Sequence, residues 1–324
     1  MSENDNKKTE SENDNKKTES TEFGVSEMAI IAAQRSTREK IWNHRLVLGF
    51  VRYPPAFVAL IIASFFLFFA FMAPLIVSWD PNKPVLSDTL TPPVWSFAFN
   101  SVHSLGTDTV GRDVFVRILM GGRVSILLGV TGATGAATIG VVFGLIAGWK
   151  RGIIGAFIMR WADLQIALPL LLMALTVAAV FGPGLHILLI LFSLWFWGPY
   201  ARISEGLTLS LKNREFVEAA RSIGATPRRI VFRHVLPHLF SPLLVLWSFS
   251  CAILIIIEAS LSFLGVGIPP PTASWGSMLA EGRQYLHRAY WLAMMPGAAI
   301  SMMVWSINTL GDRLRDVIDQ RQYL

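Results

Sequence analysis

Charged residues are scarce in this sequence. They make up 15% of the 324 residues, whereas a soluble domain typically carries about a quarter. Hydrophobic residues account for 53% of the chain and are concentrated in long runs. Such runs favour a protein that crosses a membrane over one with a large soluble core.

Cysteine is almost absent as well. Cys251 is the one cysteine, so the chain can build neither a disulfide framework nor a cysteine-rich metal site. Its place in an apolar run predicts a small buried side chain. The six histidines are scattered along the chain, and no metal site is expected.

Three catalytic or nucleotide-binding motifs are also missing. The sequence lacks the Gly-x-x-x-x-Gly-Lys-[Ser/Thr] loop that cradles ATP phosphates, the His-Glu-x-x-His motif and the Gly-x-Ser-x-Gly motif. We therefore expect the chain not to be an enzyme and to bind no cofactor itself. No basic stretch alternates with exposed aromatic residues as a single-strand groove requires, so nucleic acid is not an expected partner.

Residues 1–34 form a polar N-terminal tail in which SENDNKKTE occurs twice, at 2–10 and 11–19. The repeat has no apolar side chain and cannot bury enough surface to offset the entropy lost on ordering, so we expect it to be disordered. It is not a signal peptide, because no apolar run follows it directly.

Six apolar runs are long enough to cross a hydrocarbon core of about 30 Å as helices. They are roughly Ala56–Ser78, Val124–Trp149, Ile154–Phe181, Leu185–Ser204, Leu239–Leu261 and Trp291–Leu310. Only helices and closed barrels satisfy their backbone groups in lipid. The predicted fold class is therefore an all-α polytopic membrane protein with six transmembrane helices.

Lysine and arginine orient these spans, because both are enriched in cytoplasmic segments. With the N-terminus inside and the tail left out, the inside segments carry 18 Lys and Arg and the outside segments carry six. Both termini are therefore predicted to be cytoplasmic. The same asymmetry is consistent with the net charge of +6.

The spans divide the chain into parts. After the tail come a basic segment with the first transmembrane helix (35–78), an external loop with a surface helix (79–123), a core transmembrane region (124–311) and a cytoplasmic C-terminal tail (312–324). The surface helix is predicted because Asp108 can cap a helix with one apolar face. That face comprises Val114, Phe115, Ile118 and Leu119.

Gly140, Gly144 and Gly148 recur every four residues in the second span. A strip of small residues lets another helix approach closely. We expect a packing seam against a helix of the same subunit or of a second one.

Three charged residues fall in or near the spans, where a charge is costly and often functional. Arg160 and Asp163 lie three residues apart and are placed to pair on one helix face. A structural ion pair is favoured there over a role in the pathway. Glu258 has two open alternatives: it lines the translocation path, or it hydrogen-bonds the loop 262–276, whose Gly and Pro residues exclude a continuous helix.

The segment 215–237 joins the fourth and fifth spans and reads EFVEAARSIGATPRRIVFRHVLP. Its first part predicts an amphipathic helix, whose apolar face comprises Phe216, Ala219, Ala220 and Ile223. Gly224 can end that helix in a left-handed conformation. Thr226 and Pro227 then suit the N-cap and first position of a second helix, and Pro237 begins the fifth span. Without further context this could be a helix lying on lipid headgroups.

The spacing of Glu218-Ala219-Ala220, Gly224 and Leu236-Pro237 resembles the EAA loop of ABC-importer membrane subunits. With LGTDTVGRD at 105–113, the loop 262–276 and GDRLRD at 311–316, it resembles the C-type membrane subunit of oligopeptide and dipeptide permeases, from about Arg45 to the C-terminus. Two positions depart from the family pattern. His234 replaces a frequent aliphatic residue, and Gln320 replaces a proline.

The resemblance implies a type I importer transmembrane domain in the bacterial cytoplasmic (inner) membrane, moving di- or oligopeptides. Its EAA loop would dock on an ATPase, with polar contacts from Glu218, close approach at Ala219 and Ala220, and a turn at Gly224. The implied partners are a second homologous permease subunit, two ATP-binding subunits that hold ATP and Mg²⁺, an extracytoplasmic solute-binding protein and membrane lipid.

Two alternatives stay open at this stage. The same family includes importers of nickel and other small solutes. An ion-coupled secondary transporter acting alone would instead use Asp163 and Glu258. Such transporters often contain inverted repeats, and no convincing internal repeat is visible in the sequence.

Overall fold

The computed structural model of the chain describes residues 53–76, 83–94 and 103–319. Within these ranges the regular structure is helical, with one isolated β-bridge between Thr107 and Asp113 and no strand. The predicted all-α fold is confirmed for this part of the chain. The tail 1–34 and the basic residues up to Arg52 lie outside the described residues.

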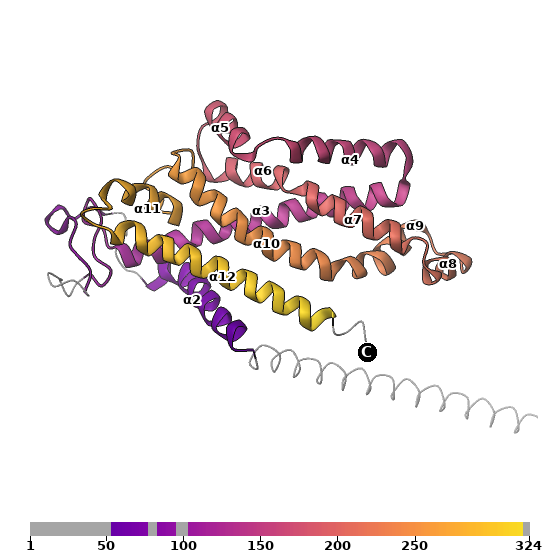
Figure 1. Cartoon of the computed structure of the whole chain (residues 1–324), viewed down its shortest axis with the longest axis horizontal. Coiled ribbons are helices and arrows are strands. Elements are labelled where there is room, and N and C mark those ends of the chain that lie inside the picture. The colour runs from indigo at the N-terminus through magenta and orange to yellow at the C-terminus, as the bar shows by residue number, and fades with distance from the viewer. Residues whose placement is uncertain (1–52, 77–82, 95–102, 320–324) are drawn as a thin grey trace, which may run out of the picture. The chain divides into compact units, whose positions relative to one another are not determined.

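Figure 1 shows the helices, in which two long elements are followed by a run of short ones before α10. The four long helices are α2 (Pro54–Ile76), α3 (Val114–Lys150), α10 (Leu236–Phe263) and α12 (Trp291–Asp319). The shorter ones are α4 (Gly152–Ala167), α5 (Leu170–Phe181), α6 (Leu185–Trp195), α7 (Trp197–Leu211), α8 (Glu215–Ser222), α9 (Pro227–Ile230) and α11 (Trp275–Gly282). Two 3₁₀ turns, η1 (Leu86–Asp88) and η3 (Arg283–Tyr285), and a π turn, η2 (Val231–Val235), complete the described structure.

Four helical stretches of the described residues are long and apolar enough to cross a membrane. They are Pro54–Met72, Val114–Lys150, Leu185–Leu211 and Pro227–Phe263. A fifth arises if α4 and α5 together form one broken span. The predicted sixth run lies in α12, which is helical throughout but is not among these stretches.

The third predicted span is not one straight helix. α4 and α5 meet at an angle of 88°. The break follows from Pro169, because a proline disfavours the helical conformation of the residue before it. Leu168 accordingly has an extended backbone, with φ −85° and ψ 136°. Predicting a continuous helix over Ile154–Phe181 was therefore wrong.

The predicted surface helix is also wrong as a separate element. Its residues form the first turns of α3, which continues unbroken to Lys150. The N-cap is Asp113, whose carboxylate accepts the N–H of Val116 at 3.0 Å. Val114 and Ile118 are buried rather than laid against lipid. Likewise, the predicted C-terminal tail begins as helix, because α12 extends to Asp319.

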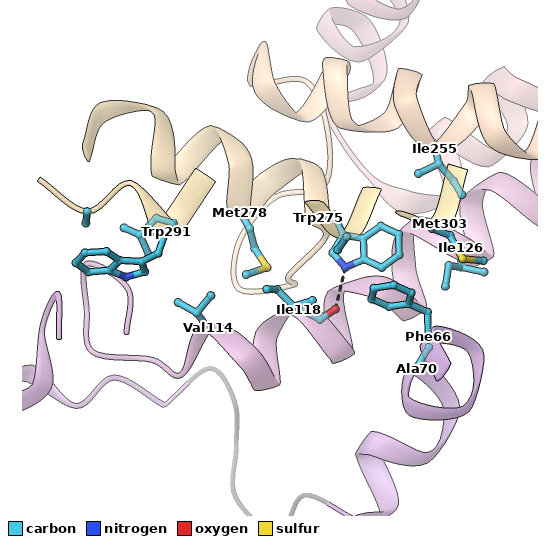
Figure 2. Packing of buried hydrophobic residues seen from close by; sticks show 13 residues of the cluster. Phe66, Ala70, Val114, Ile118, Ile126, Ile255, Trp275, Met278, Trp291 and Met303 are labelled. Carbon is cyan, nitrogen blue, oxygen red and sulfur yellow. Dashed lines mark hydrogen bonds between the residues drawn. The ribbon is translucent and has the colours of Figure 1, made fainter. Parts of the chain in front are cut away.

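Trp275, the first residue of α11, lies in the middle of an apolar cluster (Figure 2). Its side chain is buried, and the indole N–H donates to the carbonyl oxygen of Ile118 at 2.8 Å. The Phe66 ring of α2 packs edge-on against it at 5.3 Å. The end of the preceding loop, Ala273 and Ser274, is buried too. The loop 262–276 is therefore packed at its end, whereas residues 269–272 are exposed.

Four charged side chains join the first turns of α3 to α11. The Arg117 guanidinium lies 2.6 Å from the Asp108 carboxylate and 2.8 Å from that of Glu281. Arg112 contacts the same two carboxylates at 2.5 and 3.2 Å. The Arg117 and Asp108 side chains are only 3% and 4% exposed, so this end of α3 carries a buried, charge-balanced network.

The glycine strip of α3 packs against α7 of the same subunit. A Cβ added to Gly140 would overlap the carbonyl oxygen of Trp197, and one added to Gly144 would overlap that of Ala201. At Gly148 the added atom would lie 2.7 Å from Cβ of Thr208. Of the two predicted alternatives, the structure therefore shows the seam within the subunit.

Candidate functional site

The segment 215–237 forms the predicted helix, turn and helix. α8 begins at Glu215, and Gly224 takes φ +80° just after its end. The N–H of Ala225 donates to the carbonyl of Ala220 at 3.0 Å, and that of Gly224 donates to Arg221 at 2.9 Å. This pair of bonds is a Schellman motif, which requires a left-handed residue where Gly224 stands.

The second helix also starts as predicted. Thr226 is its N-cap, with the side-chain oxygen accepting the N–H of Arg229 at 3.4 Å, and Pro227 occupies the first turn. Pro237 does not open a new helix, because α9, η2 and α10 follow one another without a break. The π turn η2 precedes Pro237, whose ring cannot fit against the carbonyl four residues earlier in a regular α-helix. The local widening thus accommodates the proline.

The buried face of α8 differs from the predicted one. Val217 and Ala220 are 0% and 5% exposed and join the apolar cluster formed by α3, α7 and α10. Ile223 is 86% exposed and Phe216 is 37% exposed. Side-chain direction depends on the helices that α8 packs against, which the helical spacing alone does not specify.

The outward face of α8 therefore combines acidic, small and apolar groups. Glu218, Ala219 and Gly224 are all exposed on it, together with Ile223. An isolated exposed isoleucine needs no explanation. Here it lies beside small residues that admit a close neighbour, so this face is suited to contact another protein.

Trp149, in the last turn of α3, holds two cations from the neighbouring helices. The Lys212 ammonium at the end of α7 donates to the Trp149 carbonyl at 2.5 Å and lies 5.3 Å from the indole ring. The Arg221 guanidinium of α8 lies 5.5 Å from the same ring. Partial burial, and then the nearby Arg151 and Arg221, lower the pKa of Lys212. Positive charge is therefore crowded around this indole.

Asp163 does not pair with Arg160. It forms an ion pair with Arg202 of α7, and Arg160 is exposed. The predicted i,i+3 pair is wrong because α4 packs along α7, which offers a cation to the side of α4 that carries Asp163. The favoured interpretation of Asp163 as part of a structural ion pair agrees with this contact.

Glu258 is fully buried in α10 and accepts three hydroxyl hydrogen bonds. Its carboxylate lies 2.8 Å from the Ser125 hydroxyl of α3, 2.9 Å from Ser262 and 2.8 Å from Ser274. Ser274 ends the loop 262–276 and caps α11. Of the two alternatives for Glu258, the structure shows the one in which it hydrogen-bonds this loop.

Residues 140–322 match the protein family described as the binding-protein-dependent transport system inner membrane component. This chain belongs to that family. The matched range contains the whole segment 215–237. The resemblance to an ABC-importer membrane subunit, drawn from that segment, is thereby confirmed.

Several curated relatives of this inner membrane component are permease proteins. It is 38% identical to the di/tripeptide transport system permease protein DppC of Pseudomonas aeruginosa, over 78% of this chain and 84% of that one. It is 36% identical to the oligopeptide transport system permease protein OppC of Bacillus subtilis, over 82% and 85%. It is 40% identical to the glutathione transport system permease protein GsiD of Pectobacterium atrosepticum, over 68% and 74%.

The fold is also similar to that of a solved transporter. Inward-facing structures of the MetNI methionine ABC transporter align with a TM-score of 0.51 and 20% sequence identity, covering 63% of this chain and 97% of the other. At that identity the likeness concerns the fold alone. The described helices thus share their fold with a chain of that transporter.

Some residues of the site were not found from the sequence. Trp149, Arg202 and Lys212 carry no motif, and each joins helices that are distant in the chain. A weak signal was present for Trp149 and Lys212, because both stand at the ends of long apolar runs, where amphipathic side chains collect. No local pattern indicated that Arg202 pairs with Asp163.

Proposed function

We propose that this inner membrane component is the permease subunit of an ATP-driven peptide importer, coupled to a separate ATPase through α8. The observation that carries the proposal is the outward face of α8. Glu218 and Ala219 are exposed there, while Val217 and Ala220 anchor the helix to α3 and α7. A helix anchored on one face and open on the other is suited to dock on a partner and to pass its movement inward.

The proposed assembly contains a second homologous permease subunit, two ATP-binding subunits with ATP and Mg²⁺, and an extracytoplasmic solute-binding protein. We place the chain in the bacterial cytoplasmic membrane with six spans, counting the α4–α5 pair as one and α12 as the last. Both termini and α8 then lie in the cytoplasm. The excess of Lys and Arg in these segments supports that orientation.

An ion-coupled transporter acting alone is disfavoured by the two carboxylates that suggested it. Asp163 is paired with Arg202. Glu258 is buried, and both of its oxygens accept hydroxyl hydrogen bonds. Asp163 is thus neutralised by a cation, and Glu258 is closed off from a passing ion.

Reversing the charge of Glu218 tests the coupling. In liposomes that hold the whole complex and its binding protein, Glu218→Lys is expected to reduce ATP-driven uptake at least tenfold, because a cation replaces the acidic group on the docking face. The control is Asp312→Lys at an exposed carboxylate of α12, which should transport as the wild type does. Uptake by the wild type without ATP, or full uptake by Glu218→Lys, would refute the proposed coupling.

The cargo is tested by competition. The relatives named for di/tripeptide, oligopeptide and glutathione transport support a substrate with peptide bonds. Uptake of a labelled dipeptide is expected to fall when unlabelled dipeptide or a longer peptide is added in excess, and to be unchanged by nickel. Competition by nickel alone would favour the alternative, an importer of nickel or another small solute.

A further inference from the structure

α3 extends from the charged network beside α11 to the region of α8. Its 37 residues rise about 1.5 Å each. One end lies in the network of Arg117, Asp108 and Glu281 beside α11, and the other end reaches α8 (Figure 1). α3 is unbroken from Val114 to Lys150, so one continuous helix joins its last turn to that network.

The contact between α3 and α8 is narrow. α8 has eight residues, too few to be stable as an isolated helix in water. Val217 and Ala220 supply its buried face. The side chain of Arg221, in its last turn, reaches across to the Trp149 ring, and a cation within about 6 Å of an indole centroid is attracted to the ring face.

Trp149 also contacts α7, the helix that leads into α8. The Lys212 ammonium binds both the carbonyl and the ring of this residue, and Arg214 follows two residues later with its carbonyl accepting the N–H groups of Val217 and Glu218. The indole therefore contacts the chain on both sides of α8, at Lys212 just before its start and at Arg221 in its last turn. No other described residue has two cations stacked on its ring.

We propose that Trp149 is a positioning residue that makes α3 follow the movement of α8. The inference rests on the proposed function, in which α8 contacts an ATPase. A movement imposed on α8 displaces Arg221 and Lys212, and their contacts with Trp149 pull the last turn of α3 in the same direction. Without the ring, α8 still docks and ATP is still hydrolysed, but only the apolar contacts of Val217 and Ala220 remain to move α3, so α3 follows α8 less closely.

The test measures substrate taken up per ATP hydrolysed, in liposomes holding the full complex and its binding protein. Trp149→Leu is expected to lower this ratio at least fivefold while the amount of assembled complex and the ATPase rate stay within twofold of wild type. Trp149→Phe keeps an aromatic face and should retain the ratio. Trp161→Leu, at an exposed tryptophan of α4, is the matched control and should match the wild type.

A double-mutant cycle tests whether the contact between Arg221 and Trp149, rather than either side chain alone, is responsible for the effect. Arg221→Gln should lower the ratio, and Trp149→Leu with Arg221→Gln should be no worse than Trp149→Leu alone, because both changes remove one interaction. The inference is overturned if Trp149→Leu keeps the wild-type ratio of substrate to ATP, or if Trp149→Phe loses as much of that ratio as Trp149→Leu. It is also overturned if the two changes in the double variant lower the ratio independently, or if Trp149→Leu prevents assembly of the complex. Failure of wild-type uptake to depend on ATP would instead refute the proposed function.

Discussion

Replacing Arg117 with methionine should lower the free energy of unfolding by about 3–5 kcal/mol, the cost typical of removing one partner from a buried ion pair. Methionine keeps much of the volume of the arginine stem. The loss therefore comes from the two carboxylates left behind, Asp108 and Glu281, which lie 2.6 and 2.8 Å from the guanidinium and would then share Arg112 as their one remaining cation in the network. Denaturation of the purified protein in mixed detergent micelles measures the change.

Arg123→Met is the matched control for this prediction. Arg123 lies on the same helix but is exposed, so its loss should change the free energy of unfolding by less than about 0.5 kcal/mol. Adding Glu281→Gln to Arg117→Met should recover part of the stability, because one uncompensated carboxylate is then removed. Equal effects of the Arg117 and Arg123 variants would show that the network contributes nothing.

Adding methyl groups to the seam between α3 and α7 is the second change expected to lower stability strongly. The double variant Gly140→Ala, Gly144→Ala should have a free energy of unfolding lower by about 4 kcal/mol, if overpacking costs about 2 kcal/mol at each site. Both added methyl groups would overlap backbone carbonyl oxygens of α7, at Trp197 and Ala201. A backbone cannot rotate away as a flexible side chain does, so the two helices must separate.

Gly206→Ala on α7 is the control for the same substitution. An added Cβ there has no atom within 4 Å. Since glycine within a helix is less stable than alanine by roughly 0.5–1 kcal/mol, this variant should be neutral or more stable than the wild type. Helix propensity favours alanine at all three positions, so opposite changes in the free energy of unfolding at Gly206 and at the seam would show the steric contribution separately. Stabilisation by all three substitutions would contradict the close approach of α3 and α7.

The helix–turn–helix of the segment 215–237 could be predicted from the sequence because its signals are local. Gly224 ends α8, and Thr226 and Pro227 start α9, through bonds that span only a few residues. The apolar face of α8 was predicted less well. Val217 is buried while Ile223 is exposed, because the neighbouring helices, rather than the spacing, decide which side is covered.

The sequence predicted where the apolar helices lie better than where they bend. Hydropathy locates the apolar runs but does not report where the backbone bends within them. Pro169 breaks the third run by 88°, whereas Pro237 and Pro242 are accommodated in the long stretch Pro227–Phe263. A π turn lies just before Pro237, and such adjustments depend on the surrounding helices that satisfy or replace the lost backbone bonds.

The helical, membrane-spanning character of the described residues and the helix–turn–helix of 215–237 could be predicted from the sequence, and the spacing of that segment resembles the EAA loop of ABC-importer membrane subunits. Hydrophobic run length, capping residues and the Glu218 to Pro237 spacing act over short stretches of chain. Three contacts could not be predicted without the folded structure: Asp163 pairs with Arg202, Glu258 hydrogen-bonds the loop before α11, and Trp149 joins α3 to α8. Such contacts join residues that are distant in the chain, as Lys212 and Trp149 are at 63 positions apart, and they depend on how the helices pack.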